Sequence, residues 1–152
     1  MKLARGGIDA FLTKESDYGI RIVRALADGD KKTVGEICDR EHIPMQYAYK
    51  ILKKLEGAGF LQGHRGRSGG YQLIRDTGTF TIYDIVVAVD SSLLLFECLK
   101  KDNVCPNNTP DSYCAVHIEF QRVQELLIEE MRRKTVGEVM ADAIEPASQT
   151  NS

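Results

Sequence analysis

The chain has 152 residues and a formal net charge of −2, and a chain of this length can bury one substantial hydrophobic core. With 43% hydrophobic and 28% charged residues, its composition is that of an ordinary globular domain. No stretch approaches the ~20 apolar residues that span a bilayer, and residues 1–10 lack the apolar core of a signal peptide. These features predict a cytoplasmic protein without a membrane partner, built as one domain plus an extension.

The small net charge hides an uneven distribution. Residues 1–75 contain 14 Lys and Arg against 9 Asp and Glu, whereas residues 76–152 contain 6 against 13. No acidic residue occurs between residues 57 and 75, although this segment includes Arg65 and Arg67. The basic half favours a surface that binds a polyanion, and the acidic half favours solvation or contact with a partner.

Two helices are predicted in the first forty residues. Thr13 is a candidate N-cap for the first, which the turn Asp28-Gly29-Asp30 ends. Thr33 and Glu36 have the spacing of a capping box, so a short second helix begins there and ends near His42.

A third helix begins at Pro44, which is tolerated in a first turn, and ends at Gly57 and Gly59. Its expected buried stripe consists of Tyr47, Ile51, Leu52 and Leu55. Because a tight turn joins the second and third helices, they predict a helix-turn-helix.

A basic β-hairpin is predicted next. Residues 60–62 and 71–74 have the pattern of two short strands, and the glycine-rich turn between them carries Arg65 and Arg67. A fourth helix is expected from Thr81 to Val89. The hairpin follows the helix-turn-helix at the spacing of a wing.

These elements predict contacts with double-stranded DNA. The third helix of a helix-turn-helix enters the major groove, where Gln46 and Tyr49 would meet base edges and the lysines would meet phosphates. The glycines of the wing permit close approach to the sugar-phosphate chain, so that its cations lie in or beside the minor groove. The predicted DNA-binding residues are Gln46, Tyr47, Tyr49, Lys50, Lys53, Lys54, Arg65, Arg67 and Ser68. The alternative for the lysines is a solvated helix surface.

Three cysteines lie in a polar, turn-rich segment over residues 91–114. Six residues separate Cys98 from Cys105, and eight separate Cys105 from Cys114. Soft thiolates favour zinc or an iron-sulfur cluster, but structural zinc prefers cysteines two to four residues apart. Disulfides are the second interpretation, because the expected compartment is reducing. Cys38, on the apolar face of the second helix, is expected to be a small buried hydrophobe.

The fourth ligand has two candidates. His117 is three residues beyond Cys114 and would share its helix face. Asp17 lies at the start of the first helix and could reach the cysteines only through tertiary or dimer contacts. The simpler alternatives are a surface histidine and an acid that suits the helix dipole.

A long helix over residues 115–142, with its C-terminal turn, is predicted to mediate dimerisation. Its apolar seam consists of Val116, Phe120, Val123, Leu127 and Met131. A seam outside an already complete small domain needs a partner surface, which a second copy of the chain supplies. Residues 143–152 are polar and are expected to be a disordered tail.

Several of these patterns together resemble the IscR/NsrR/CymR family of bacterial winged-helix regulators, also called the Rrf-two family. The resemblance covers about residues 11–140. It lies in Leu12-Thr13-Lys14-Glu15-Ser16-Asp17-Tyr18, Ile43-Pro44-Met45-Gln46-Tyr47, residues 51–55, Arg65-Gly66, Gly69-Gly70-Tyr71 and the three-cysteine segment. The cysteine gaps are wider than the five-residue gaps typical of the best-known members of the family.

The resemblance implies a homodimer that binds a palindromic promoter site, with affinity modulated by an iron-sulfur cluster that senses redox state, nitric oxide or iron-sulfur status. Cys98, Cys105 and Cys114 match the cluster thiolates. His117 stands where IscR-like members place a histidine ligand, and Asp17 where NsrR-like members place an aspartate from the other subunit. Both a 2Fe-2S and a 4Fe-4S cluster therefore remain open. The alternative is a metal-free, CymR-like regulator that responds to a protein partner or to thiol oxidation.

The expected fold is mainly α with a small β-hairpin (α+β). A winged helix-turn-helix domain occupies residues 1–90, with residues 1–10 as an N-terminal arm. The cluster-binding loop of residues 91–114 follows, and the dimerisation helix and C-terminal turn complete the chain. No nucleophile-base pair or nucleotide-binding loop occurs in the sequence, so we expect neither an enzyme nor a small-molecule substrate.

Overall fold

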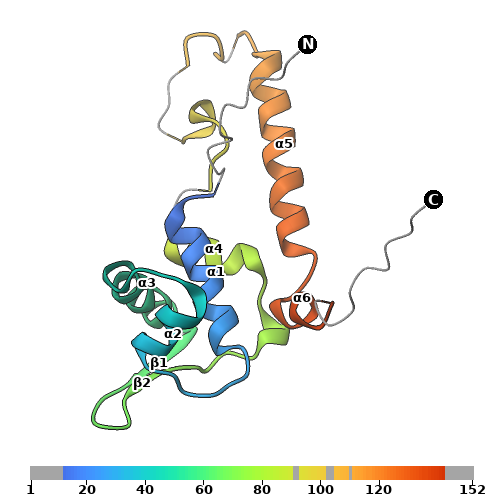
Figure 1. The fold of residues 1–152 in the computed structure, drawn as a ribbon. Coiled ribbons are helices and arrows are strands. Elements are labelled where there is room, and N and C mark those ends of the chain that lie inside the picture. The colour runs from blue at the N-terminus through green and yellow to red at the C-terminus, as the bar shows by residue number, and fades with distance from the viewer. Residues whose placement is uncertain (1–11, 91–92, 102–104, 110, 143–152) are drawn as a thin grey trace, which may run out of the picture.

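A computed structural model describes residues 12–90, 93–101, 105–109 and 111–142. Within these residues the chain forms six α-helices and one two-stranded antiparallel sheet. Helices α1 to α4 gather into a body, and α5 rises from it as a long arm beside the cysteine segment (Figure 1). The hairpin loop and the N-terminal end of α5 lie at opposite ends of the molecule. The predicted N-terminal arm and C-terminal tail lie outside the described residues.

The predicted helix-turn-helix is confirmed. Helices α1, α2 and α3 span Lys14–Leu26, Val34–Glu41 and Met45–Gly57. The Thr13 side chain accepts a hydrogen bond from the Ser16 amide, and Thr33 and Glu36 form a complete capping box. His42 ends α2 in the left-handed region at φ 54°, which turns the chain sharply into α3.

The hairpin consists of β1 (Leu61–His64) and β2 (Gly70–Leu73), with Leu61 opposite Leu73. Both strands lie closer to the turn than the sequence predicts, because Phe60 belongs to the core and meets Phe80 edge to face at 5.0 Å. The backbone of Lys32 exchanges two hydrogen bonds with that of Tyr71, at 2.9 and 2.8 Å. The wing is therefore fastened directly to the entrance of α2.

The rest of the chain wraps back onto the same core. Short 3₁₀ turns η1 (Thr77–Thr79) and η2 (Glu97–Leu99) flank α4 (Ile82–Val89), and α5 (Ala115–Arg132) leads to α6 (Val136–Asp142). The final turn predicted from the sequence is thus a helix. Val136 of α6 is 1% exposed, and its amide donates to the Phe80 carbonyl at 2.8 Å. Among the described helices, none is long and apolar enough to cross a membrane.

Gly70 supplies a test of how firmly the wing is attached. Its φ is +142°, and an added Cβ would lie 2.5 Å from the Lys32 carbonyl oxygen. Replacement by alanine must therefore move the hairpin away from Lys32, and we expect G70A to lower the free energy of unfolding by about 1–3 kcal/mol. Urea unfolding measures this.

Gly57 provides the matched control, because a Cβ there meets nothing within 4 Å. G57A should leave the free energy of unfolding unchanged or raise it by up to about 1 kcal/mol. Equal effects of G70A and G57A would contradict the close attachment of the wing.

Candidate nucleic-acid interface and thiol site

Helix α3 turns one side into the core and the other outward. Ala48, Ile51, Leu52 and Leu55 are each 0% exposed. The sequence prediction was correct for the last three, but Tyr47 is 41% exposed and packs against the Tyr18 ring at 5.8 Å between centroids. Ala48 takes the buried position because its small side chain fits between the packed helices. The exposed positions on α3 include Gln46, Tyr49, Lys50 and Lys53.

A hollow separates this face of α3 from the wing. Its walls are the start of α2, one flank of α3 and the hairpin. The lining residues are Thr33, Val34, Gly35, Tyr49, Lys53, Glu56, Gly63, His64, Arg65, Gly66, Arg67, Gly69, Gly70 and Tyr71. Glu56 accepts a hydrogen bond from the Gly63 amide at 2.8 Å, which holds the end of α3 to β1. The structure therefore brings three predicted cations, Lys53, Arg65 and Arg67, to one concave surface.

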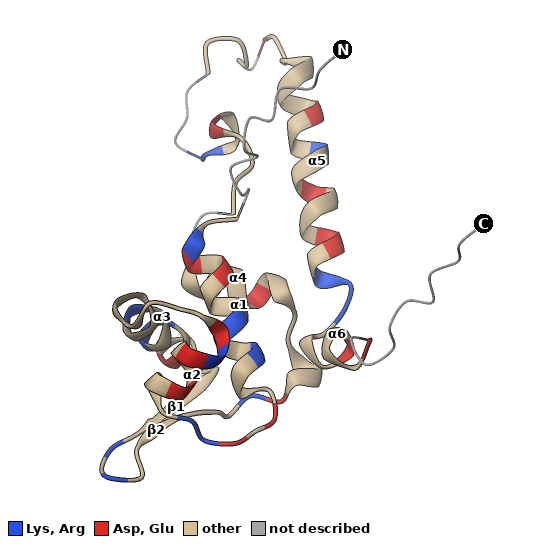
Figure 2. Cartoon of the chain, viewed as in Figure 1, with Lys and Arg blue, Asp and Glu red and all other residues tan. Residues whose placement is uncertain are grey.

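The loop at the end of the hairpin is exposed and basic (Figure 2). Gly66 has φ +101°, and its carbonyl accepts from the Gly69 amide at 2.9 Å, so a glycine-dependent turn closes the loop. Ser68 lies in this turn and is exposed. This geometry presents Arg65, Arg67 and Ser68 together, away from the body.

The opposite flank of α3 meets α1. Lys50 donates to one Glu15 carboxylate oxygen at 2.5 Å, and Lys54 donates to the other. Lys54 also donates to the Val89 carbonyl at 2.6 Å, at the end of α4. These hydrogen bonds, from Lys50 first and then Lys54, hold the pKa of Glu15 below its ordinary value. Two of the predicted phosphate-binding lysines, Lys50 and Lys54, thus form intramolecular ion pairs with Glu15.

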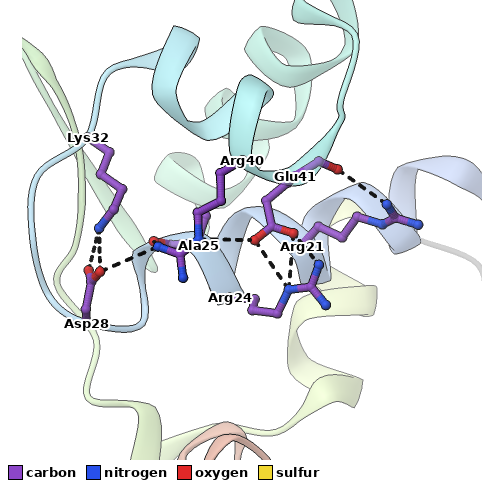
Figure 3. Close-up of polar contacts among 7 residues, drawn as sticks. All are labelled: Arg21, Arg24, Ala25, Asp28, Lys32, Arg40 and Glu41. Carbon is purple, nitrogen blue, oxygen red and sulfur yellow. Dashed lines mark hydrogen bonds and ion pairs between the residues drawn. The ribbon is translucent and has the colours of Figure 1, made fainter.

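A buried carboxylate joins α1 to α2 (Figure 3). Glu41 is 4% exposed and accepts from the Arg24 guanidinium, with Nε at 3.1 and 3.3 Å from its two oxygens. The hydrogen bond to Glu41 raises the pKa of Arg24. Arg21 donates to the Glu41 carbonyl at 3.3 Å, and Arg40 lies 3.8 Å from the carboxylate. This network holds the C-terminal end of α2 against α1 and so fixes the orientation of the helix-turn-helix relative to α1.

Periodicity and capping do not by themselves identify Glu41. Its spacing from Val34 and Cys38 nevertheless places it on the apolar face of α2. An acid on such a face needs a cationic partner, because burial of an unpaired charge is costly. The position of an acidic residue on the apolar face of α2 could therefore have indicated a buried ion pair from the sequence alone.

The three cysteines of the predicted cluster site lie at the far end of the molecule. Cys98 is in η2, Cys105 is in the loop and Cys114 is the N-cap of α5. All three are free thiols of intermediate exposure. Over the described ranges, no group of three His, Cys, Asp or Glu is close enough to hold a metal ion. Cys38 is buried as predicted, and burial raises the pKa of its thiol.

The two candidates for a fourth ligand differ in their surroundings. His117 Nδ1 is buried and has no hydrogen-bond partner among the described residues. Its ring lines a small hollow beside Leu94 and Leu99. Asp17 forms an ion pair with Arg21 at 3.0 Å and is half exposed on α1. Three free thiols and one unpartnered imidazole nitrogen are donor types that suit iron-sulfur ligation, although within the described residues no three of them gather at one point.

Helix α5 holds the cysteine segment but buries little of itself. The Gln124 side chain accepts from the Leu95 amide and donates to the Leu93 carbonyl, both at 2.8 Å. The Phe96 and Phe120 rings stack at 3.6 Å. Gln124 is nevertheless the only buried residue of the 18-residue helix, and Val116 is 57% exposed.

A helix-turn-helix followed by a basic two-stranded wing defines a winged-helix DNA-binding protein. Residues 12–142 match the family model described as "Rrf2: Iron-dependent Transcriptional regulator". The chain belongs to this Rrf2 family, and it is a transcriptional regulator rather than an enzyme.

Known proteins support the assignment. The transcriptional regulator IscR of Vibrio vulnificus is 28% identical over 134 residues, which cover 86% of this chain and 77% of that protein. The structure of T. potens IscR has a TM-score of 0.70 at 19% identity and covers 97% of both chains. The structure of CymR, the global cysteine regulator of B. subtilis, has a TM-score of 0.69 at 19% identity and covers 86% of this chain and 95% of CymR. The predicted family and the predicted fold class are confirmed.

The Glu41 network predicts a specific loss of stability. E41A leaves the guanidinium group of Arg24 without its acceptor, removes one of the ion pairs of Arg40 and opens a gap between α1 and α2. We expect the free energy of unfolding in urea to fall by about 1.5–3 kcal/mol. D39A on the exposed side of the same helix is the control and should change it by less than about 0.5 kcal/mol. If the two variants unfold alike, the network does not stabilise the domain.

Proposed function

We propose that this regulator is a homodimer that binds double-stranded DNA at a palindromic promoter site in the cytoplasm. The single observation that supports this most is the concave surface shared by α3 and the wing, which presents Lys53, Arg65 and Arg67 together. In this proposal Gln46 and Tyr49 meet base edges in the major groove, while the wing and Ser68 lie at the adjacent minor groove. Tyr47 flanks the base-reading positions.

The second copy of the chain covers α5. The 18-residue helix α5 buries only Gln124 in one subunit. Val116 of the predicted seam, and Ile118 and Leu126 beside it, are 57%, 56% and 51% exposed. Several exposed apolar side chains on one helix favour association with an equivalent surface, because the association removes them from water. Two-fold pairing of the subunits would present two wings and two α3 helices to the two halves of a palindrome.

The finer proposal is that an iron-sulfur cluster adjusts DNA affinity. Cys98, Cys105 and Cys114 would hold it, with His117 or the partner's equivalent of Asp17 completing a 2Fe-2S or 4Fe-4S site. Support comes from the free thiols, the unpartnered His117 nitrogen and the description of the family as iron-dependent. A bound cluster supplies a centre that reacts with oxidants and nitric oxide. The protein's part is to hold the thiolates and to transmit their rearrangement.

A metal-free regulator is the second candidate. It would respond to a protein partner or to oxidation of the thiols. Two observations favour it: no three potential ligands gather in the part of the chain that the structure describes, and the fold is shared with CymR. The DNA-binding surface is the same in both candidates.

The wing assignment predicts that R65A weakens binding to a duplex that contains the promoter of the chain's own gene. Loss of a groove contact should cost about 1–3 kcal/mol of binding free energy. Fluorescence anisotropy at physiological salt measures it. R133A is the control, because Arg133 pairs with Glu130 at the end of α5, away from the wing. If R65A binds as tightly as R133A, Arg65 does not contact DNA.

The cluster assignment predicts that serine at Cys98, Cys105 or Cys114 removes the visible absorbance, iron and sulfide of anaerobically reconstituted protein. C38A should retain all three, because Cys38 lies in the core of the winged domain. H117A and D17A, compared in the same way, identify the fourth ligand. A wild-type protein that stays colourless and iron-free after reconstitution would instead support the metal-free candidate.

A further inference from the structure

Glu15 is an acidic residue of α1 that contacts the DNA-facing helix α3. It lies in the first turn of α1, yet its two carboxylate oxygens accept from Lys50 and Lys54 of α3, 35 and 39 residues further along the chain. The two lysines are one helical turn apart on the same flank of α3. One carboxylate therefore holds two of the cations that the helix can offer to DNA.

The contact is accessible to a competing anion. The side chains of Lys50, Lys54 and Glu15 are 59%, 35% and 27% exposed. Exposed ion pairs of this kind contribute roughly 0–1 kcal/mol to folding, so the fold does not depend on them. Burial of the apolar side of α3 already holds this helix in place.

Lys53 offers an internal comparison on the same helix. It is exposed and lines the hollow beside the wing. Within the described residues it forms no ion pair, so its charge is fully available to a phosphate. Lys50 and Lys54 would instead have to leave Glu15 before they could neutralise DNA charge.

We propose that Glu15 is an internal competitor of the DNA phosphates: it occupies Lys50 and Lys54 in the free protein and thereby lowers the affinity of the regulator for DNA. This inference rests on the proposed DNA-binding function. The Glu15 carboxylate can take the place of a DNA phosphate, since lysine ammonium groups bind carboxylate and phosphate oxygens alike. When DNA takes the lysines, the uncovered Glu15 carboxylate also faces the phosphate chain as a like charge.

The competition is present throughout the physiological pH range. Its lysine partners hold the pKa of Glu15 below the ordinary value, so the carboxylate stays ionised wherever the protein is folded near neutrality. Lys54 is held additionally by the Val89 carbonyl. Lys50, with Glu15 as its only partner among the described residues, should therefore be released the more readily.

The test compares E15Q with wild type on a 30-base-pair duplex of mixed sequence, by fluorescence anisotropy over a series of salt concentrations. Glutamine keeps the size of the side chain and removes its charge. We expect E15Q to bind about 3- to 10-fold more tightly near 0.1 M salt. The plot of log K against log salt should steepen by about 1, because E15Q removes one negative charge that offsets the lysines at the phosphate chain.

E130Q is the matched control, because it removes the same charge from an exposed ion pair with Arg133 on α5. If E15Q binds no more tightly than E130Q, the inference is overturned, whereas the proposed function survives as long as wild type binds the duplex. A wild-type protein that does not bind at low salt overturns both.

A second measurement does not depend on E15Q. In the wild-type background K53Q should weaken DNA binding more than K50Q does, because only Lys50 is already neutralised inside the molecule. In the E15Q background the two losses should become similar. A K50Q loss equal to that of K53Q in wild type would contradict the competition, and thermal unfolding of each variant confirms that the compared proteins are folded.

Discussion

The burial of one side of α3 is the constraint on which the rest of the structure depends. Ile51, Leu52 and Leu55 are completely excluded from water, and complete burial of such a side chain is worth about 1.5–3 kcal/mol. Because these three residues must point inward, Gln46 and Tyr49 are held outward on rigid backbone. The Glu41 network and the Lys32–Tyr71 backbone pairing then place α2 and the wing relative to that helix.

Polar contacts hold the described residues on each side of positions 91 and 92. Gln124 of α5 binds the backbone at Leu93 and Leu95, just before the first cysteine of the segment. Before those positions, Lys54 of α3 binds the carbonyl of Val89, the last residue of α4. In the proposed regulation, a coupling of about 1–3 kcal/mol between the thiol segment and the DNA-facing helix would change affinity 5- to 150-fold.

Capping and turn residues predicted most of the helix boundaries, whereas contacts between residues far apart in the chain could not be predicted from the sequence. Thr13, Thr33 and Pro44 each mark a helix start through chemistry confined to one turn, so the boundaries of α1, α2 and α3 were predictable. The Glu15–Lys54 contact and the return of α6 onto the core join residues that the chain keeps far apart. Tyr47 was misplaced for a related reason, since periodicity cannot tell which of two adjacent positions has room for a ring.

The proposed thiol site follows a different energetic logic from the DNA-binding surface. A buried polar atom without a partner costs about 1–3 kcal/mol, and His117 Nδ1 is such an atom. Ligation would remove that penalty, whereas Asp17 would first have to leave Arg21. An exposed pair of that kind is worth at most about 1 kcal/mol, so both donors are energetically accessible.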